Sequence, residues 1–260
     1  MKPKISATCG LLAFLALVAA CGQTPYRTDS ATRPSPSVPD ASSNVALDYL
    51  RGISESTLSS APDGSITDLL TNTKYEIQTG ELQTLCDAVV VGDIIDVQPG
   101  VGFTSTEEDP NGTLTTFDDS QADWRTVHLR VKVSEVLSGK LEASEVTVGL
   151  GLGADFRRTR QDLLDLPTTV FFLFHSPVYA YDNSLYALWR DGTTMTLVDN
   201  DGMLSMPGMD PALAAEKLRD VSTLDDLRAA AKEPDKVIKA HLDEHGRIEL
   251  LSAWLQRTGG

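Results

Sequence analysis

The feature that most constrains the fold of this chain is the segment from Thr126 to Leu137, in which apolar and polar residues alternate as far as Ser134. The apolar positions are Val127, Leu129, Val131 and Val133, and the polar positions between them are His128, Arg130 and Lys132. Successive side chains of a β-strand point to opposite faces of a sheet. The pattern therefore predicts a strand with one face in a core and the other in solvent.

Several β-branched and aromatic segments on either side of this strand predict a mainly β domain. They are rich in Val, Ile and Phe, which favour strands, and the most apolar of them is expected to be buried on both faces. We expect these strands at 88–97, 145–148, 169–174, 185–188 and 195–198. Turn sequences follow several of them, so we expect mostly antiparallel pairing within one domain, residues 45–205.

The order of these segments resembles the OB-type β-barrel of the netrin-like proteins and tissue inhibitors of metalloproteinases, and that of uncharacterised exported bacterial proteins. The resemblance covers about residues 86–205 and rests on AVVVGDIIDV at 88–97, VHLRVKVSEVLSGK at 127–140, VTV at 146–148 and VFFLF at 170–174. It implies an OB-like antiparallel β-barrel. The inhibitors bind the protease zinc through a disulfide-tethered N-terminal Cys. This chain has no matching Cys pair, so the resemblance transfers no functional residue.

Short helices are expected before the strands, where the spacing of apolar residues is helical. They are predicted at 45–50, 66–70 and 81–86.

The last part of the chain, residues 206–260, is expected to form a C-terminal helical extension. Asp210 before Pro211 is typical of a helix start, because Asp caps free N–H groups and Pro suits the first helical position. The later helix starts are Ser222 or Thr223 and then Pro234, with the last helical region reaching about Arg257.

Residues 1–20 resemble the signal peptide of a bacterial lipoprotein. A basic start precedes an apolar run that is too short to span a bilayer, which takes about 20 apolar residues. The run ends in VAAC at 18–21, which is similar to a lipobox and implies acylation of Cys21. We therefore expect an extracytoplasmic protein anchored to the bacterial cell membrane through the lipid on Cys21. An ordinary signal peptide with a chance Cys is the alternative.

Residues 21–44 are predicted to be a disordered tether. Pro, Ser and Thr dominate the segment, and it has no periodic apolar residues. Such a segment has too little apolar surface to offset the entropy lost on ordering. It would hold the folded part away from the membrane.

Composition excludes two further possibilities. Of the three cysteines, Cys9 leaves with the signal peptide and Cys21 carries the lipid, which leaves Cys86. An exported domain without a Cys pair has no disulfide framework, so a packed core must stabilise it. The formal net charge of −15 repels nucleic acid, so no nucleic-acid partner is expected.

The acidic stretch between Thr104 and Asp123 is a candidate calcium site. Its carboxylates include Asp109, Asp118 and Asp119. Calcium prefers carboxylate and carbonyl oxygens, and a long loop on a rigid barrel often carries recognition. A solvated surface loop is the alternative, and we expect no other cofactor.

The segment HLDEH at 241–245 matches the H-x-x-E-H string of inverted zinc peptidases. On a helix, His241 and His245 would share a face and bind zinc, and Glu244 would act as a base. These enzymes need a third ligand, for which Glu249 is the near candidate. A polar helix end is the alternative.

Two functional hypotheses follow. The first is a non-enzymatic, lipid-anchored module that binds a protein or a ligand at the cell envelope. The second is a metal-dependent envelope hydrolase whose site is assembled from residues scattered along the sequence. The absence of a complete nucleophile or metal motif in the sequence favours the first hypothesis.

Replacing Cys21 by Ala is expected to release the protein from membranes into the soluble fraction, because the lipid would have no attachment point. Membrane fractionation followed by immunoblotting measures this. Intact-mass spectrometry that finds Ala20 still joined to Cys21 in the mature protein would contradict the expectation.

Overall fold

The computed structural model describes residues 44–57, 64–104, 113–152, 155–176, 181–242 and 248–250. Within these residues the protein is mainly β, with four α-helices and two sheets. The α-helices are α1 (Val45–Thr57), α2 (Phe156–Leu164), α3 (Pro211–Lys217) and α4 (Leu224–Ala230). There are also two short 3-10 helices, η1 (Ile66–Leu69) and η3 (Trp189–Gly192). The strands are β1 (Thr73–Glu76), β2 (Leu82–Gln83), β3 (Ala88–Thr104), β4 (Thr113–Thr116), β5 (Trp124–Gly139), β6 (Glu145–Leu152), β7 (Thr169–Phe174), β8 (Leu185–Leu188), β9 (Thr196–Val198), β10 (Leu204–Ser205), β11 (Lys236–Leu242) and β12 (Ile248–Leu250).

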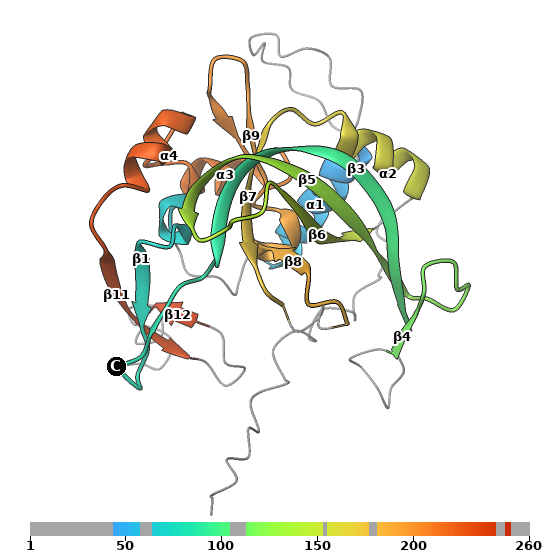
Figure 1. Cartoon of the computed structure of the whole chain (residues 1–260), viewed down its shortest axis with the longest axis horizontal. Helices are drawn as coiled ribbons and strands as arrows, with labels where there is room; N and C mark the ends of the chain where they lie inside the picture. Colours follow the sequence, from blue (N-terminus) through green and yellow to red (C-terminus); the bar gives the residue numbers. More distant parts are fainter. Residues whose placement is uncertain are drawn as a thin grey trace, which may run out of the picture.

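The larger sheet has eight strands in the order β10-β9-β7-β8-β6-β5-β3-β4, and β7 also pairs with β3. The pairings therefore run from β3 through β5, β6, β8 and β7 back to β3. In this series β6 and β8 are parallel and the other pairs are antiparallel. Figure 1 shows β3 and β5 arching together over β6 and β8. The predicted mainly β architecture is confirmed.

The alternation in β5 places its apolar side chains in the core, as predicted. Val127, Leu129 and Val131 are completely buried, and Val133 packs partly buried against the same core. On the other face Arg130 and Lys132 are exposed. The register of β3 against β5 shifts at several positions, and such bulges increase the local bend and twist of a hairpin. The two long strands can therefore curve around the core instead of forming a flat ribbon.

One core lies inside the arch of strands. It is built from the inward positions of β3, β5, β6 and β7, and α1 and α2 contribute to it. Its largest completely buried members include Leu50, Leu129, Leu163, Phe171 and Leu173. The start of α1 is joined to the last turn of α2, because the backbone N–H of Val45 and the side-chain amide of Asn44 both donate hydrogen bonds to Asp162.

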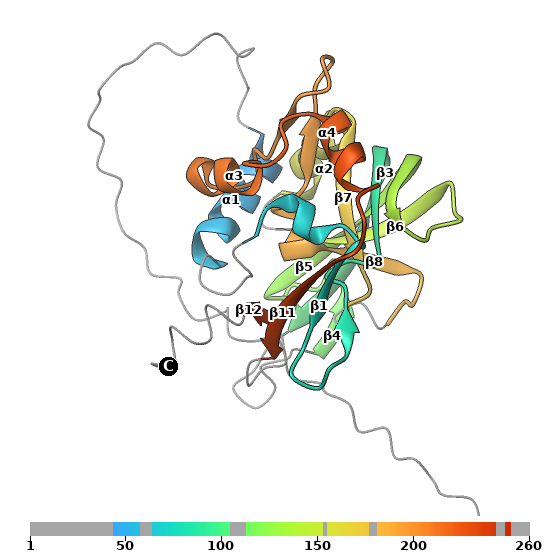
Figure 2. The same ribbon diagram turned by 90° about the vertical axis from the view of Figure 1, so that its left-hand side faces the viewer.

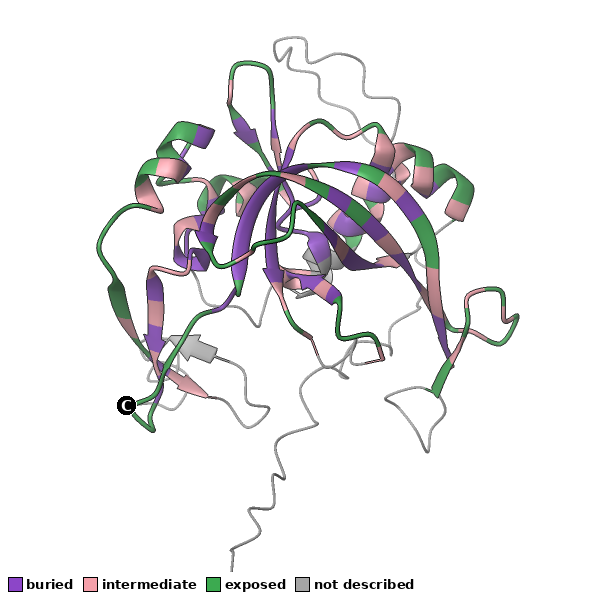
Figure 3. Ribbon diagram, in the orientation of Figure 1, coloured by how far each residue is buried: buried purple, intermediate pink, exposed green. Residues whose placement is uncertain are grey.

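A second core lies on the opposite face of β3 and β7. Val89 and Val91 of β3 and Val170 and Phe172 of β7 point into it, so β7 and the first residues of β3, 88–92, are buried on two faces. Figure 3 colours β7 as buried along nearly its whole length. Residues from η1, β1, α4 and β11 cover this face. The fully buried strand predicted at 169–174 is thus confirmed.

The smaller sheet joins two early strands to the last two described strands, in the order β12-β11-β1-β2. β1 and β11 are parallel, with Thr73 opposite Lys236 and Glu76 opposite Lys239. Figure 2 shows this sheet beside the larger one. The amide of Asn72 donates to the carbonyl oxygens of Ala230 and Glu233, which fixes the end of α4 against the start of β1.

Two helix predictions are wrong. The segment 81–86 contains β2, and the region from Pro234 towards Arg257 contains β11 and β12 where it is described. The physical reason is pairing: β1 offers an unpaired edge to β11, and Ala240 and Ile238 bury against the second core. Of the predicted C-terminal helical extension, residues 206–260, the part described up to Ala230 contains helices and the described part from Lys236 on is strand.

The helix starts predicted in that first part are confirmed. The Asp210 carboxylate accepts hydrogen bonds from the backbone N–H groups of Ala212 and Leu213 at the start of α3. Thr223 and Asp226 form a reciprocal capping box at the start of α4. Two guanidinium nitrogens of Arg228 in α4 donate hydrogen bonds to the carboxylate of Glu135 in β5, and these bonds hold the helix against the arch of strands.

The lone thiol of the described chain, Cys86, is 1 % exposed in the second core. Burial raises its pKa far above the usual value, so the thiol stays protonated and packs as a small apolar group. Among the described residues no helix combines the length and apolarity needed to cross a bilayer.

Replacing Val131 by Asp is expected to lower the free energy of unfolding by about 3 kcal/mol or more, because it buries an unpaired carboxylate in the inner core. Urea unfolding of the purified chain measures this. Arg130→Gln, on the solvent face of the same strand, is the matched control and is expected to change stability by less than about 0.5 kcal/mol. If Val131→Asp were as stable as the parent, the face of β5 that contains Val131 would not be the one in the core.

Candidate functional site

A pocket with several polar side chains in its lining lies where η1, β1, η3 and α3 meet, at the edge of the second core. Its empty volume, open mouth included, is about 320 Å³. The polar residues that line it are Ser65, Asp68, Tyr75, Arg190, Thr194 and Lys217. Its apolar wall is made by Ile66, Leu69, Leu85 and Trp189. A concave site with an apolar wall and a few convergent polar groups is the usual form of a ligand site.

Lys217 is the most unusual residue of this pocket, because it is a lysine that is only 7 % exposed. Its Nζ donates a hydrogen bond to the carbonyl oxygen of Gly64 at 2.8 Å. Its own carbonyl oxygen accepts a hydrogen bond from Ser65 Oγ at 3.1 Å. Buried lysines are rare unless they are paired or used, since removing an ammonium group from water is costly.

Asp68 supplies the negative charge of the pocket. Its side chain is 12 % exposed, and its Oδ1 lies 2.7 Å from Lys236 Nζ. The carboxylate sits directly over Gly64, where a Cβ would collide with it, so the glycine permits this close approach. The side chains of Lys217 and Asp68 therefore both contact the backbone at Gly64.

Tyr75 adds a buried hydroxyl, which donates to the carbonyl oxygen of Asp68 at 3.5 Å. Burial raises the pKa of Tyr75 well above its usual range, and the negative charge of Asp68 raises it further. The phenol therefore remains protonated and acts as a hydrogen-bond donor rather than as a base.

Arg190 is held in a strained backbone conformation. Its φ is 52°, which makes it the non-glycine residue with positive φ among the described residues. The Thr193 backbone N–H and hydroxyl both donate to the Arg190 carbonyl oxygen, at 3.0 and 2.9 Å. Thr194 Oγ1 donates to the carbonyl of Trp189 at 2.8 Å. These bonds hold η3 in place and keep the arginine at the pocket.

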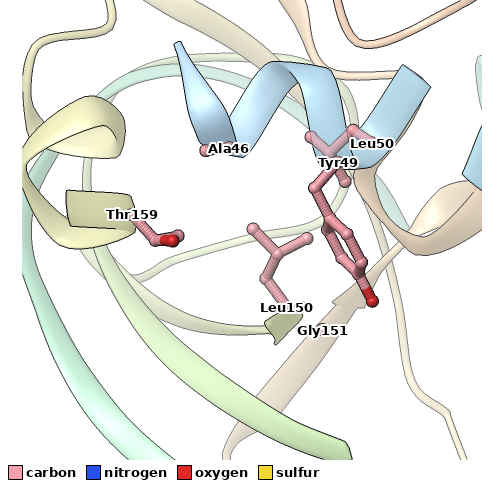
Figure 4. Close-up of a pocket in the computed structure, with 6 residues that line it drawn as sticks. All are labelled: Ala46, Tyr49, Leu50, Leu150, Gly151 and Thr159. Atoms are coloured by element: carbon pink, nitrogen blue, oxygen red, sulfur yellow. The ribbon is translucent and has the colours of Figure 1, made fainter. Parts of the chain in front are cut away.

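A second, apolar pocket lies between α1, α2 and the end of β6. Its empty volume is about 210 Å³, its open side included. Figure 4 shows Ala46, Tyr49 and Leu50 of α1 facing Leu150 and Thr159 across it. Thr159 is 5 % exposed, and its Oγ1 has no hydrogen-bond partner among the described atoms.

The residues predicted for a calcium site are not gathered by the described part of the loop. Asp109 lies outside the described residues, and Asp118 is exposed. Asp119 caps its own turn, accepting hydrogen bonds from the Thr115 hydroxyl and the Gln121 backbone. The hydrogen bond from Thr115, joined by that from Gln121, lowers the pKa of the Asp119 carboxyl.

Arg125 occupies the place where a cation would be expected in this turn. Its guanidinium donates to the carbonyl oxygens of Phe117, Asp119 and Ala122, at distances of 2.7, 2.6 and 3.3 Å. The carbonyl oxygens of this loop therefore point at the guanidinium group of Arg125. The described residues contain no group of three or more His, Cys, Asp or Glu side chains placed to hold a metal ion.

The predicted zinc arrangement on a helix is wrong for His241. This residue lies in β11, opposite Glu249 of β12, because the segment pairs as a strand. His245 and Glu244 lie outside the described residues, as does the lipidation candidate Cys21.

The residues of the polar pocket were not predicted from the sequence, although the sequence pattern around Lys217 indicates that it is buried. Lys217 follows Leu213 and Ala214 at helical spacing, so it occupies a position of the apolar stripe of α3. A charged residue in such a stripe indicates a buried polar contact. Arg190 left no signal, because the sequence Arg-Asp-Gly at 190–192 is an ordinary turn sequence.

Comparison with known proteins identifies no relative: no family model, no curated protein and no solved structure matches this chain.

Replacing Thr159 by Val is expected to raise the free energy of unfolding by about 1 kcal/mol, because it exchanges an unpaired buried hydroxyl for a methyl of the same size. Thermal or urea unfolding measures this. Thr159→Ala is the control, since it removes the hydroxyl but also leaves a small cavity, and it is expected to be less stable than the Val variant. A loss of stability in Thr159→Val would show that the hydroxyl has a partner.

Proposed function

We propose that this chain is a lipid-anchored protein of the bacterial cell envelope that binds a ligand without transforming it. The anchor is supported by the VAAC sequence at 18–21 and by the Pro, Ser and Thr content of residues 21–44. Together they describe an extracytoplasmic domain that is attached to the membrane through the lipid on Cys21 and held at a distance from it.

The domain is proposed to be an OB-type barrel with a second layer added to one side. The series of pairings from β3 through β5, β6, β8 and β7 back to β3 supports this assignment. The parallel β6–β8 pair and the position of α2 between β6 and β7 support it further. Such barrels serve many binding functions, so the fold alone assigns no ligand.

The observation that carries the binding proposal is the burial of Lys217 beside Asp68 in a pocket with an apolar wall. The packing of α3 against the second core would be satisfied by Leu or Met at this position. A lysine in its place brings a charged side chain to the pocket lining, where it joins Asp68 and the Tyr75 hydroxyl. Polar groups that face an apolar wall suit a small polar ligand.

The experiment is native mass spectrometry of the full chain purified from its own cell envelope. A small molecule is expected to stay bound in the intact complex and to be released on denaturation. Trp189→Leu keeps an apolar side chain but changes the pocket wall, and it is expected to lower the occupied fraction at least about fivefold. Leu82→Ala, at an exposed site on β2, is the matched control and is expected to keep full occupancy.

Circular dichroism of both variants checks that they are folded. If the protein carries no small molecule, or if occupancy is the same in Trp189→Leu and the parent, the pocket is not the binding site. Envelope proteins recovered with the full chain in the same preparation would then identify a protein partner, the other ligand class that the sequence predicts.

A further inference from the structure

We propose that residues 251–257, which follow β12, fold back over the outer face of the smaller sheet and bury Trp254 against it. The segment covers Val237 and Leu82, which the described residues leave exposed. This surface is distinct from the ligand pocket, because the pocket residue Tyr75 is buried on the opposite face of β1. The sheet thus acquires an intramolecular partner on the face that the second core does not cover.

The smaller sheet has one buried face and one open face. Tyr75 of β1 and Ala240 of β11 are buried in the second core, and Ile238 packs against it. The side chains between them point to the other face, because successive residues of a strand alternate. That outer face is formed by Lys74 and Glu76 of β1, Leu82 of β2, and Val237, Lys239 and His241 of β11.

Two apolar side chains of the outer face are unusually exposed. Leu82 is 53 % and Val237 is 51 % exposed, the highest values among the exposed large hydrophobic side chains of the described residues. In Figure 3 the start of β11 is accordingly coloured as exposed. Val237 lies opposite Lys74, and Leu82 lies opposite Glu76. The two apolar side chains are therefore about 12 Å apart, so one bulky ring placed between them can contact both.

The direction of β12 brings the following residues to this surface. β12 runs antiparallel to β11, and Leu250 lies opposite Ala240. Each residue after Leu250 therefore steps back along β11, and the chain comes level with Val237 after three positions, the difference between 240 and 237. From there a few residues are enough to cross β11 and β1, because neighbouring strands are about 4.8 Å apart.

The residues after Leu250 have the apolar pattern of a segment that packs on one side. Leu251, Trp254 and Leu255 are spaced as on one face of a helix, with polar or small residues between them. A short helix with such a stripe is stable in water only when the stripe packs on an apolar surface. The path of β12 leads this stripe to Val237, and burial of the tryptophan ring gives the largest share of the contact.

A second copy of the chain suits this face less well. The formal charge of −15 makes two copies repel each other, whereas residues 251–257 contain one arginine and no acidic residue. The segment is also joined to the sheet through β12, which gives it a high effective concentration at the surface. Docking within one molecule is therefore favoured over association between molecules.

The test uses the full chain labelled with fluorinated tryptophan and observed by fluorine NMR. Trp124 and Trp189 serve as internal references, and Trp254→Phe identifies the remaining resonance. On transfer from light to heavy water, the Trp254 resonance is expected to shift at least about twofold less than that of the free amino acid, because a docked ring is removed from solvent.

Val237→Glu removes the apolar contact and preserves the sheet, because the new carboxylate lies beside Lys74 and Lys239. It is expected to give the Trp254 resonance the solvent response of the free amino acid. Leu114→Glu is the matched control, because it places the same acid at an exposed apolar position of β4, and it is expected to leave the resonance unchanged. Circular dichroism checks that both variants are folded.

Melting temperatures give a second, independent measurement. Trp254→Ser is expected to lower the melting temperature of the full chain by about 3 °C, since it removes the docked ring. The double variant with Val237→Glu is expected to melt within about 1 °C of Trp254→Ser alone, because both changes remove the same contact.

Three results would overturn the proposal. The first is a Trp254 ring that responds to solvent like the free amino acid in the parent chain. The second is shielding of this ring only at protein concentrations at which analytical ultracentrifugation detects a dimer, which would show that a second copy covers the face. The third is an equal effect of Val237→Glu and Leu114→Glu on the Trp254 resonance.

Discussion

The structure depends on one short stretch of β3, residues 88–92, which pairs with β5 along one edge and with β7 along the other. This stretch closes the series of paired strands, and its side chains alternate between the two cores. Val90 points inward, and Val89 and Val91 point to the second layer. In a chain whose described part has no disulfide, the burial of this strand on both faces supplies stability that a cross-link gives to many exported domains.

Much of the fold could be predicted from the sequence because the strands of the arch are strongly patterned. The alternation in β5 and the continuous apolar run of β7 indicated not only strands but also which faces are buried. The caps at Asp210 and Thr223 likewise fixed two helix starts from local chemistry alone. Each of these features can be recognised from residues that are close in the sequence.

The features that could not be predicted depend on distant partners. The segment KVIKAHL of β11 has residues that suit either a helix or a strand, and its pairing with β1 decides between them. The candidate pocket shows the same limit, because its residues come from η1, β1, η3 and α3. A buried lysine or a strained arginine becomes visible only when these segments are brought together.

The parallel pair of β1 and β11 has a consequence for how the chain reaches its folded state. The paired residues are about 160 positions apart in the sequence, so the second layer is a contact of very high sequence separation. A chain that emerges from a ribosome or a translocation channel with its N-terminus first exposes β1 long before β11 is available. During that interval β11 does not yet cover its part of the outer faces of β3 and β7, which include Val89, Val91 and Phe172. Apolar surface that stays open until the last strands arrive favours aggregation, so slow arrival of β11 would lower the yield of folded protein.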